Sequence, residues 1–445
     1  MPVVSARAAA GATAASLDDV ALGRATMRRV SLRLLPFLFL LYICNYLDRT
    51  NLSIAALQMN RDLHFSSSAF GLGAGVFFIG YSLFEVPSNL LLVRVGARKW
   101  IARIMISWGI LAAAMMFVRT PFQFYTVRFL LGVAEAGFFP GIIYLLSQWF
   151  PAAQRASATA RFMIAIPLST ALGGPLGGLL LGLNGRAGLA GWQWLFVVEG
   201  IPSVVLGLCV LGVLRDSPSD VKWLTPEERG WLASRLARDD AESAAPHGVP
   251  PLRALASPVL WLLTVPWFVL LTASYGYAFW APTVVRDALH SSNFVTGAIV
   301  GLFAVLAACF GLLMGASADR TGEPALHSAI GAGVIAIGYA GAALMPTPVL
   351  RIASLALVTI GVSGFHPGFW CLPGMLLRGT SAAAGIAFVN AVGNIGGFVG
   401  PTVIGFVKDA TGSTKGAFLA LAVLPLIAAA VLMTLRRRAE FATVP

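Results

Sequence analysis

The chain has 445 residues, of which 58% are hydrophobic and only 11% are charged. A soluble globular domain is charged at about a quarter of its positions, so this composition excludes a soluble globule and predicts a polytopic membrane protein. The net charge of +12 does not indicate nucleic-acid binding, because the arginines fall between apolar runs rather than on one basic face, and we expect no nucleic-acid partner.

The first apolar segment, 33–57, is long enough to cross a bilayer and carries two adjacent charges, Asp48 and Arg49. They lie about 15 residues into the segment, which at a rise of about 1.5 Å per residue is roughly 20 Å from its start. An ionised group so deep in a membrane usually faces a protein interior or an aqueous cavity. This pair therefore indicates a transport pathway.

Residues 1–32 precede the first span. They lack the apolar core of a signal peptide, so we expect them to form a cytosolic tail.

A spanning helix needs about 20 mainly apolar residues, and the chain has twelve such segments. Lysine and arginine gather in the short loops on one side of them, so the positive-inside rule places both termini in the cytosol. The predicted spans are 33–57, 68–92, 100–118, 122–147, 156–183, 192–214, 258–283, 294–318, 326–345, 348–373, 382–408 and 416–435.

The longest polar break divides the spans six and six. Within it, Thr225-Pro226-Glu227-Glu228 has the capping-box pattern with proline at the first helical position, which predicts a short surface helix. The predicted domains are a cytosolic tail at 1–32, a six-helix bundle at 33–214, a cytosolic linker at 215–257, a second six-helix bundle at 258–435 and a cytosolic tail at 436–445.

The two halves repeat each other's glycine and proline patterns. Gly137–Gly141 in the fourth span is echoed by Gly364–Gly368 in the tenth, and Pro175 in the fifth span by Pro401 in the eleventh, at nearly one offset. Such echoes predict two six-helix pseudo-repeats with the working site near the membrane midplane between them.

In the fourth span, Arg128 and Glu135 lie seven residues apart and so share one helix face. A guanidinium can bind a carboxylate through two parallel hydrogen bonds, which makes an organic anion a natural ligand of Arg49 and Arg128. Burial disfavours an ionised carboxylate whereas a nearby guanidinium favours it, so Asp48 and Glu135 are the predicted proton-coupling residues. A fixed Arg–Glu pair between helices is the alternative interpretation.

The second half has no ionisable residue deep in a span except His366, for which we expect a packing role. Its candidates for substrate binding are Tyr275, Asn390 and Asn394, because a buried amide or hydroxyl needs a partner; for the tyrosine, simple packing is an equal alternative. In the first half, Glu85 is assigned to a gate or a helix contact, and Glu199 to a structural hydrogen bond.

Four motifs resemble known transporters. Gly315–Gly322 (GASADRTG) is similar to the cytoplasmic loop motif of the major facilitator superfamily. Within that superfamily, Asn45–Asn51 (NYLDRTN), Arg128–Gly141 and Gly393–Pro401 resemble the anion:cation symporter family. The resemblance implies an all-α fold of twelve transmembrane helices. Bacterial members import organic acids such as hexonates, glucarate, tartrate, phthalate and hydroxyphenylacetate, usually with protons.

The resemblance also implies a cytoplasmic gate formed by Asp319, Arg320 and Arg94 together with Glu85, and a cavity-facing Tyr81. The first-half copy of the loop motif departs from the superfamily pattern at Val93, where an aspartate is usual.

We therefore expect a monomeric transporter in the bacterial inner membrane that takes up a small organic carboxylate with protons by alternating access. Protons are the expected coupling ion, with no cofactor and no metal. A facilitator, exchanger or exporter of another small molecule is the alternative. The sequence contains no HExxH or GxxxxGK motif and no Ser-His-Asp set, so we do not expect an enzyme.

Overall fold

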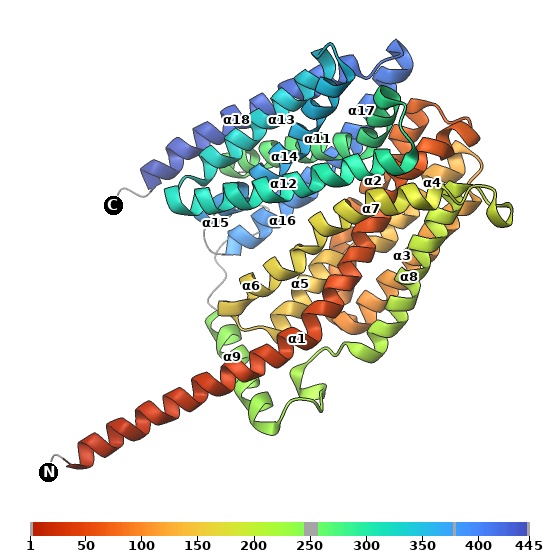
Figure 1. Ribbon diagram of the computed structural model, residues 1–445. Coiled ribbons are helices and arrows are strands. Elements are labelled where there is room, and N and C mark those ends of the chain that lie inside the picture. The colour runs from red at the N-terminus through yellow and green to blue at the C-terminus, as the bar shows by residue number, and fades with distance from the viewer. Residues whose placement is uncertain (1–2, 244–256, 377–379, 443–445) are drawn as a thin grey trace.

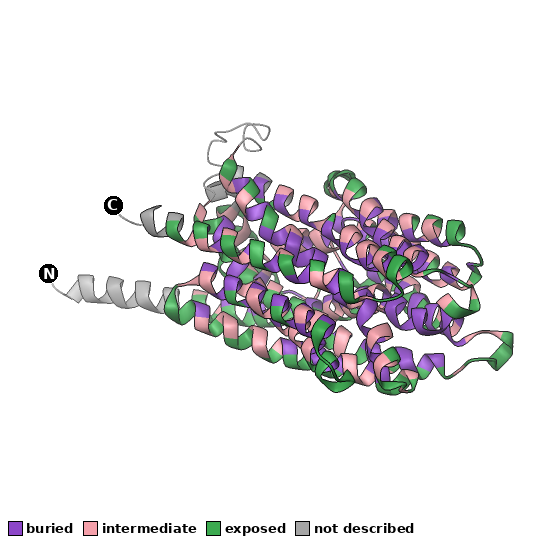
Figure 2. Cartoon of the chain, turned by 90° about the horizontal axis from the view of Figure 1, so that it is seen from above, coloured by how far each residue is buried: buried purple, intermediate pink, exposed green. Residues whose placement is uncertain are grey.

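The computed structural model describes residues 3–243, 257–376 and 380–442, which form helices and turns without a strand. Figure 1 shows two groups of helices side by side, with both chain termini at the same end of the molecule. We call this the terminal end and the opposite one the far end. Buried residues line the contacts between helices, and exposed residues lie on the outer faces and at the turns (Figure 2).

The first group contains α1 (Val3–Asp62), α2 (Ser67–Val95), α3 (Ala97–Ala114), η1 (Met115–Phe117), α4 (Pro121–Glu135), α5 (Phe138–Trp149), α6 (Ala152–Met163), α7 (Ala165–Leu181), η2 (Arg186–Gly188) and α8 (Gly191–Val213). The linker contributes η3 (Pro218–Asp220) and α9 (Pro226–Ser243). The second group contains α11 (Pro258–Leu289), α12 (Asn293–Thr321), α13 (Pro324–Leu344), α14 (Pro348–Phe369), α15 (Cys371–Leu376), α16 (Thr380–Asn394), α17 (Gly396–Thr411) and α18 (Lys415–Ala442).

Twelve helical segments among the described residues are long and apolar enough to cross a membrane, which confirms the predicted number of spans. The largest difference concerns the first helix, which begins at Val3 rather than at residue 33. The predicted N-terminal tail is thus largely helical. Its sequence is rich in alanine, leucine and arginine, which favour helices, and between Val3 and Pro36 no proline interrupts it.

Four spans are broken, and they occupy corresponding places in the two halves. The fourth span breaks between α4 and α5 and the tenth between α14 and α15, while the fifth breaks between α6 and α7 and the eleventh between α16 and α17. The matched breaks bear out the internal repeat, and discontinuous helices of this kind usually border the binding site of a transporter.

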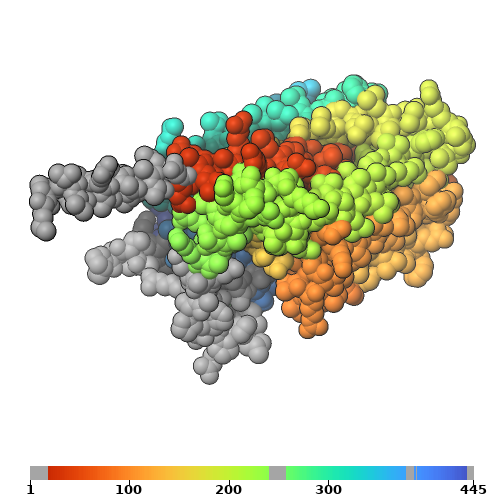
Figure 3. Space-filling model, turned by 90° about the horizontal axis from the view of Figure 1, so that it is seen from below, coloured from red at the N-terminus to blue at the C-terminus, as the bar shows by residue number. Residues whose placement is uncertain are grey.

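The linker helix α9 begins with the predicted capping box. The Thr225 N–H donates to Glu228 Oε2 at 2.9 Å, and the Glu228 N–H donates to Thr225 Oγ1 at 3.2 Å. Glu228 also pairs with Arg29 of α1 at 2.9 Å, so the linker is attached to the terminal part of the first helix. Figure 3 shows the light-green linker residues packed against the red α1.

The two groups of helices meet backbone to backbone at the far end. A side chain at Gly71 of α2 would collide with the carbonyl of Pro401 on α17, and one at Gly174 of α7 would collide with Gly297 on α12. Only glycine allows such close approach. At the terminal end, no glycine in the described part of the chain forms a comparable contact between the groups. The structure is therefore closed at its far end.

Two charged side chains of the second group complete this closure by capping helices of the first. The carboxylate of Asp409 accepts hydrogen bonds from the N–H groups of Ser67 and Ser68, at 2.9 and 2.7 Å, where α2 begins. Arg286 Nη1 donates to the carbonyl of Leu57, at 2.7 Å, near the end of α1. Each charge is opposite in sign to the helix end it contacts, so both interactions are favourable.

Replacement of Asp409 is expected to open the far end. Asp409→Asn removes the negative charge from the start of α2, which costs about 1 kcal/mol and should increase the open fraction about fivefold. Spin labels on cysteines introduced at Arg119 and Lys415, in a background without the four native cysteines, would report the distance across the far end. Asp287→Asn is the control, because Asp287 pairs with Lys408 within the second group. Identical distance distributions in all three proteins would refute this role of Asp409.

Candidate functional site

An ion pair lies at the centre of the molecule. Arg49 of α1 donates from Nη2 to Oε1 of Glu135, the last residue of α4. The Glu135 side chain is 2% exposed and that of Arg49 16% exposed. The sequence predicts substrate binding for Arg49 and proton coupling for Glu135, and the structure brings the two side chains together. Since a buried charge needs a partner, the guanidinium and the carboxylate stabilise each other.

The break in the fourth span positions Glu135. Helix α4 ends there, and Gly137 follows in the left-handed conformation with φ of 87°. The hydroxyl of Ser88 on α2 donates to the freed carbonyl of Ala136 at 2.6 Å, and Trp100 Nε1 on α3 donates to the same hydroxyl at 2.9 Å. Two neighbouring helices thus fix the end of α4 and the carboxylate that it carries.

Aromatic rings surround the Arg49 guanidinium. Its central carbon lies 5.7 Å from the ring centroid of Tyr46 and 5.5 Å from those of Phe77 and Tyr81, which are cation–π distances. Its Nη1 donates to the hydroxyl of Tyr275 at 3.4 Å. Because Tyr275 belongs to α11 of the second group, Arg49 lies where the two groups of helices meet.

Asp48 takes a separate set of partners, inside the first group. Its Oδ2 accepts hydrogen bonds from Trp108 Nε1 at 2.6 Å and from Ser203 Oγ at 3.0 Å, and its Oδ1 lies 3.5 Å from Asn51 Nδ2. The side chain is buried. Adjacent residues on a helix point about 100° apart, so Asp48 faces α3 and α8 while Arg49 faces α4 and α11.

Arg128 is held by the backbone of α2. Its Nε and Nη2 donate to the carbonyls of Gly73 and Ala74 at 3.3 and 3.4 Å, and its guanidinium lies 4.8 Å from the Phe77 ring centroid. In the described chain it forms no ion pair with Glu135, so the expected shared face does not bring these two charges together. Arg128 instead lines a narrow gap with Asp48 and Asn51 that is too small to hold a water molecule.

The second group contributes amides at the contact with α2. Asn390 Nδ2 donates to Oε1 of the buried Glu85 at 3.3 Å, and Asn394 lies within hydrogen-bonding reach of the same carboxylate. The predicted binding asparagines therefore meet the predicted gate residue Glu85. The other predicted gate residues, Arg94, Asp319 and Arg320, are exposed and form no hydrogen bond or ion pair with the rest of the described chain.

Several neighbours of the charges were missed from the sequence. Tyr46 and Phe77 were not singled out, although Phe77 lies one turn before Tyr81 on the same face of α2. Trp108 and Ser203 give no signal before the fold is known. For Glu199, where a structural hydrogen bond is expected, the described chain offers only the amide of Asn51 within reach, without a well-formed hydrogen bond. His366 packs against Trp267 with its Nδ1 2.8 Å from the Val362 carbonyl oxygen, as expected for a packing residue.

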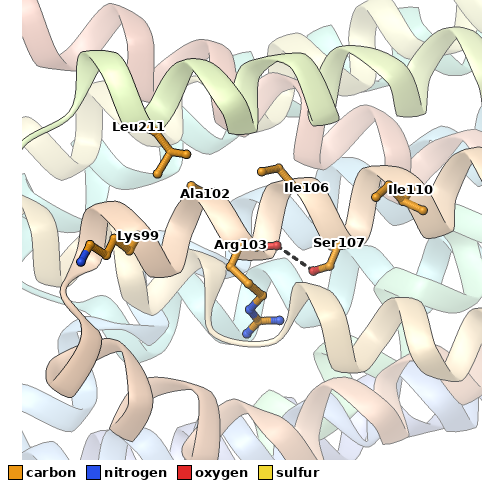
Figure 4. A pocket seen from close by; sticks show the side chains of 7 residues that line it. All are labelled: Lys99, Ala102, Arg103, Ile106, Ser107, Ile110 and Leu211. Atoms are coloured by element: carbon orange, nitrogen blue, oxygen red, sulfur yellow. Dashed lines mark hydrogen bonds between the residues drawn. The ribbon is translucent and has the colours of Figure 1, made fainter.

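A larger groove lies away from these charges, between α3 and α8 (Figure 4). Its lining is mainly apolar and includes Ala102, Ile106, Ile110 and Leu211. The hydroxyl of Ser107 is occupied by a 2.8 Å hydrogen bond to the Arg103 carbonyl. Lys99 and Arg103 also line the groove, but none of its lining residues is a carboxylate that could pair with them as Glu135 pairs with Arg49.

Known proteins place the chain in a family. The model of the Major Facilitator Superfamily matches residues 38–380. A protein of Agrobacterium vitis with the name "Putative tartrate transporter" is 47% identical, over 93% of this chain and 95% of its own. The "Quinolone resistance transporter" of Acinetobacter baumannii is 41% identical, over 90% and 92%. The solved structure of a bacterial homologue of the human lysosomal transporter Spinster matches with a TM-score of 0.76 at 19% identity, over 92% and 97%.

The chain therefore belongs to the major facilitator superfamily and has its fold. It is a multi-pass membrane transporter with twelve spans, and not an enzyme.

Gly137→Ala is expected to destabilise the protein, because a methyl group there would collide with the Ser88 hydroxyl in a backbone conformation that alanine disfavours. The expected loss is about 1 to 3 kcal/mol. Thermal unfolding in detergent would measure it. The control is Gly212→Ala, since a side chain at Gly212 meets nothing within 4 Å. Equal melting temperatures of the two variants would contradict the proposed constraint.

Proposed function

We propose that this protein is a secondary transporter that takes up a small organic carboxylate together with protons by alternating access. The observation that supports it best is the Arg49–Glu135 pair, which lies where the two groups of helices meet and has Tyr275 of the second group as a further neighbour. The name of the Agrobacterium vitis relative, a tartrate transporter, supports the same substrate class.

The pair suggests how proton and anion are coupled. While Glu135 is ionised it occupies the guanidinium of Arg49. Protonation of Glu135 weakens that hold, and the planar guanidinium can then take a substrate carboxylate through two hydrogen bonds. Deprotonation on the other side of the membrane restores the internal pair and expels the anion. Binding of the proton and of the anion therefore favour each other.

Asp48 and Arg128 act in the same cycle in this proposal. Protonation of Asp48 would loosen its hydrogen bonds to Trp108 and Ser203 and so release α1 next to Arg49. Arg128 would reach the substrate only after leaving the Gly73 and Ala74 carbonyls, which requires α2 to move. Tyr81, Tyr275, Asn390 and Asn394 offer the ring faces, hydroxyls and amides that bind the rest of the substrate. These groups suit an aromatic acid and a polyhydroxy acid equally.

The positive-inside rule gives the direction. With the terminal end in the cytosol of a bacterium, the protein lies in the inner membrane, and this structure is closed toward the outside. Arg94, Asp319, Arg320 and Glu85 then form the cytoplasmic gate in the opposite conformation. Three of these four residues are exposed in the present one, as expected for an open gate. We propose a monomer that uses protons as the coupling ion and needs no cofactor.

Export is a second candidate function. The observation that favours it is the 41% identity to a protein named for quinolone resistance. An exporter would exchange protons for an outgoing compound rather than accumulate an acid.

Uptake into proteoliposomes tests the substrate class. Labelled tartrate, hexonate, phthalate and hydroxyphenylacetate would be offered with an inward proton gradient and with the gradient collapsed. We expect one acid to accumulate only under the gradient. Equal movement in both conditions would indicate a facilitator or exchanger, and proton-driven extrusion of a quinolone with no acid uptake would indicate an exporter.

Variants of the central pair test the coupling. Glu135→Gln leaves Arg49 without its anionic partner, so exchange across the membrane should persist while gradient-driven accumulation is lost. Arg49→Lys should lower substrate affinity about tenfold to a hundredfold, because lysine has no planar fork. Radiolabel counterflow and uptake would separate the two effects.

Arg28→Gln, which changes an exposed arginine of α1, is the matched control. Accumulation by Glu135→Gln at the wild-type level would rule out Glu135 as the coupling residue.

A further inference from the structure

A second buried carboxyl group lies behind the central pair. Glu199 belongs to α8, and 6% of its surface is exposed. In the part of the chain that the structure describes, neither carboxyl oxygen makes a well-formed hydrogen bond, and only the amide of Asn51 lies within reach of the carboxyl group. Buried polar groups in proteins are nearly always hydrogen-bonded, so this residue requires an explanation.

The surroundings of Glu199 connect it to Asp48. Ser203 lies one helical turn after Glu199 on the same face of α8, and its hydroxyl donates to Asp48. The amide of Asn51 lies between the two carboxyl groups, 3.5 Å from Asp48 Oδ1 and within hydrogen-bonding reach of Glu199. Phe196, one turn before Glu199, lines the same narrow gap as Asp48 and Arg128. Glu199 is close enough to Asp48 for their charges to interact.

Among the residues that the structure describes, no cation lies close enough to neutralise Glu199. Arg49 is paired with Glu135, and Arg128 donates to the carbonyls of α2. The helix α7 and the turn η1, which also pack against α8, contain no ionisable residue. Those of α3 are Arg98, Lys99 and Arg103, in its first two turns, whereas α8 meets α3 at Gly109 and Ala113 beside Gly200. From α1 the remaining titratable neighbour is Cys44.

An ionised carboxylate without a neighbouring cation is unfavourable at this depth, and an ionised Asp48 would add repulsion. The protonated acid avoids both costs. Two carboxyl groups that share one site usually hold a single proton between them, since they cannot both ionise cheaply.

We propose that Glu199 is a proton-binding residue, and that Glu199 and Asp48 together form a second proton site inside the first group of helices, separate from the Arg49–Glu135 pair. In this conformation the proton is on Glu199, and Asp48 is ionised with Trp108 and Ser203 as its hydrogen-bond donors. A role in coupled uptake rests on the proposed function, whereas the proton on Glu199 does not.

Infrared spectroscopy of the full-length protein in lipid tests the proton directly. The carbonyl stretch of a protonated carboxylic acid should be present at neutral pH, be lost in Glu199→Gln and shift in frequency in Asp48→Asn. The control is Glu227→Gln, which changes an exposed carboxylate of α9 and should leave this band intact. Glutamine has the size and neutrality of the protonated acid, so Glu199→Gln should retain the wild-type melting temperature. A band unchanged in Glu199→Gln would overturn the proposal.

Transport assays then test the role of this proton. Glu199→Gln should retain counterflow of the accumulated acid but lose at least about half of its gradient-driven accumulation. Wild-type accumulation in this variant, with the infrared band lost, would mean a permanently protonated structural residue and would overturn the coupling role. If the wild-type protein shows no gradient-driven uptake of any acid, the proposed function fails, while the infrared result still decides the protonation of Glu199.

Discussion

The structure depends on one constraint, which is that an ionised side chain inside a membrane must have a partner of matching chemistry. The first group of helices meets it in three ways. Arg49 pairs with the carboxylate of Glu135, Asp48 accepts hydrogen bonds from Trp108 and Ser203, and Arg128 donates to backbone carbonyls of α2. The partners of the three charges lie on different helices, so these interactions also determine how the helices are rotated about one another.

The two halves repeat the same architecture but contribute different kinds of polar side chain to the interior. The first half supplies the buried charges, and the second supplies neutral polar groups, such as Tyr275 and Asn390, that reach across to them. At the far end, two charges of the second half, Asp409 and Arg286, cap helices of the first half. Charges near water are cheaper to separate than buried ones, so this end is suited to open and close repeatedly.

The Arg49–Glu135 pair suits a transporter because a single guanidinium has two competing anionic partners, one within the protein and one in the substrate. A proton decides between them. In our proposal Glu199 and Asp48 form a second site in which a proton is exchanged without competition from substrate, since no guanidinium of the described chain forms an ion pair with either carboxyl group. The two sites would respond to different events, the first to substrate binding and the second to the movement of α1 against α8.

The sequence by itself determined the twelve spans, the division into six and six, the capping box of α9 and the different directions of Asp48 and Arg49. These follow from local properties, namely apolar length, capping residues and helical periodicity. The helical start of α1 can also be predicted from the sequence, because residues 3–33 contain helix formers and no proline. Only the tertiary structure decided the partner of each charge. Arg49 and Glu135 are 86 residues apart, and Asp48 and Ser203 are 155 apart. Which of them meet depends on helix rotation and on close packing at positions such as Gly200, which no local pattern specifies.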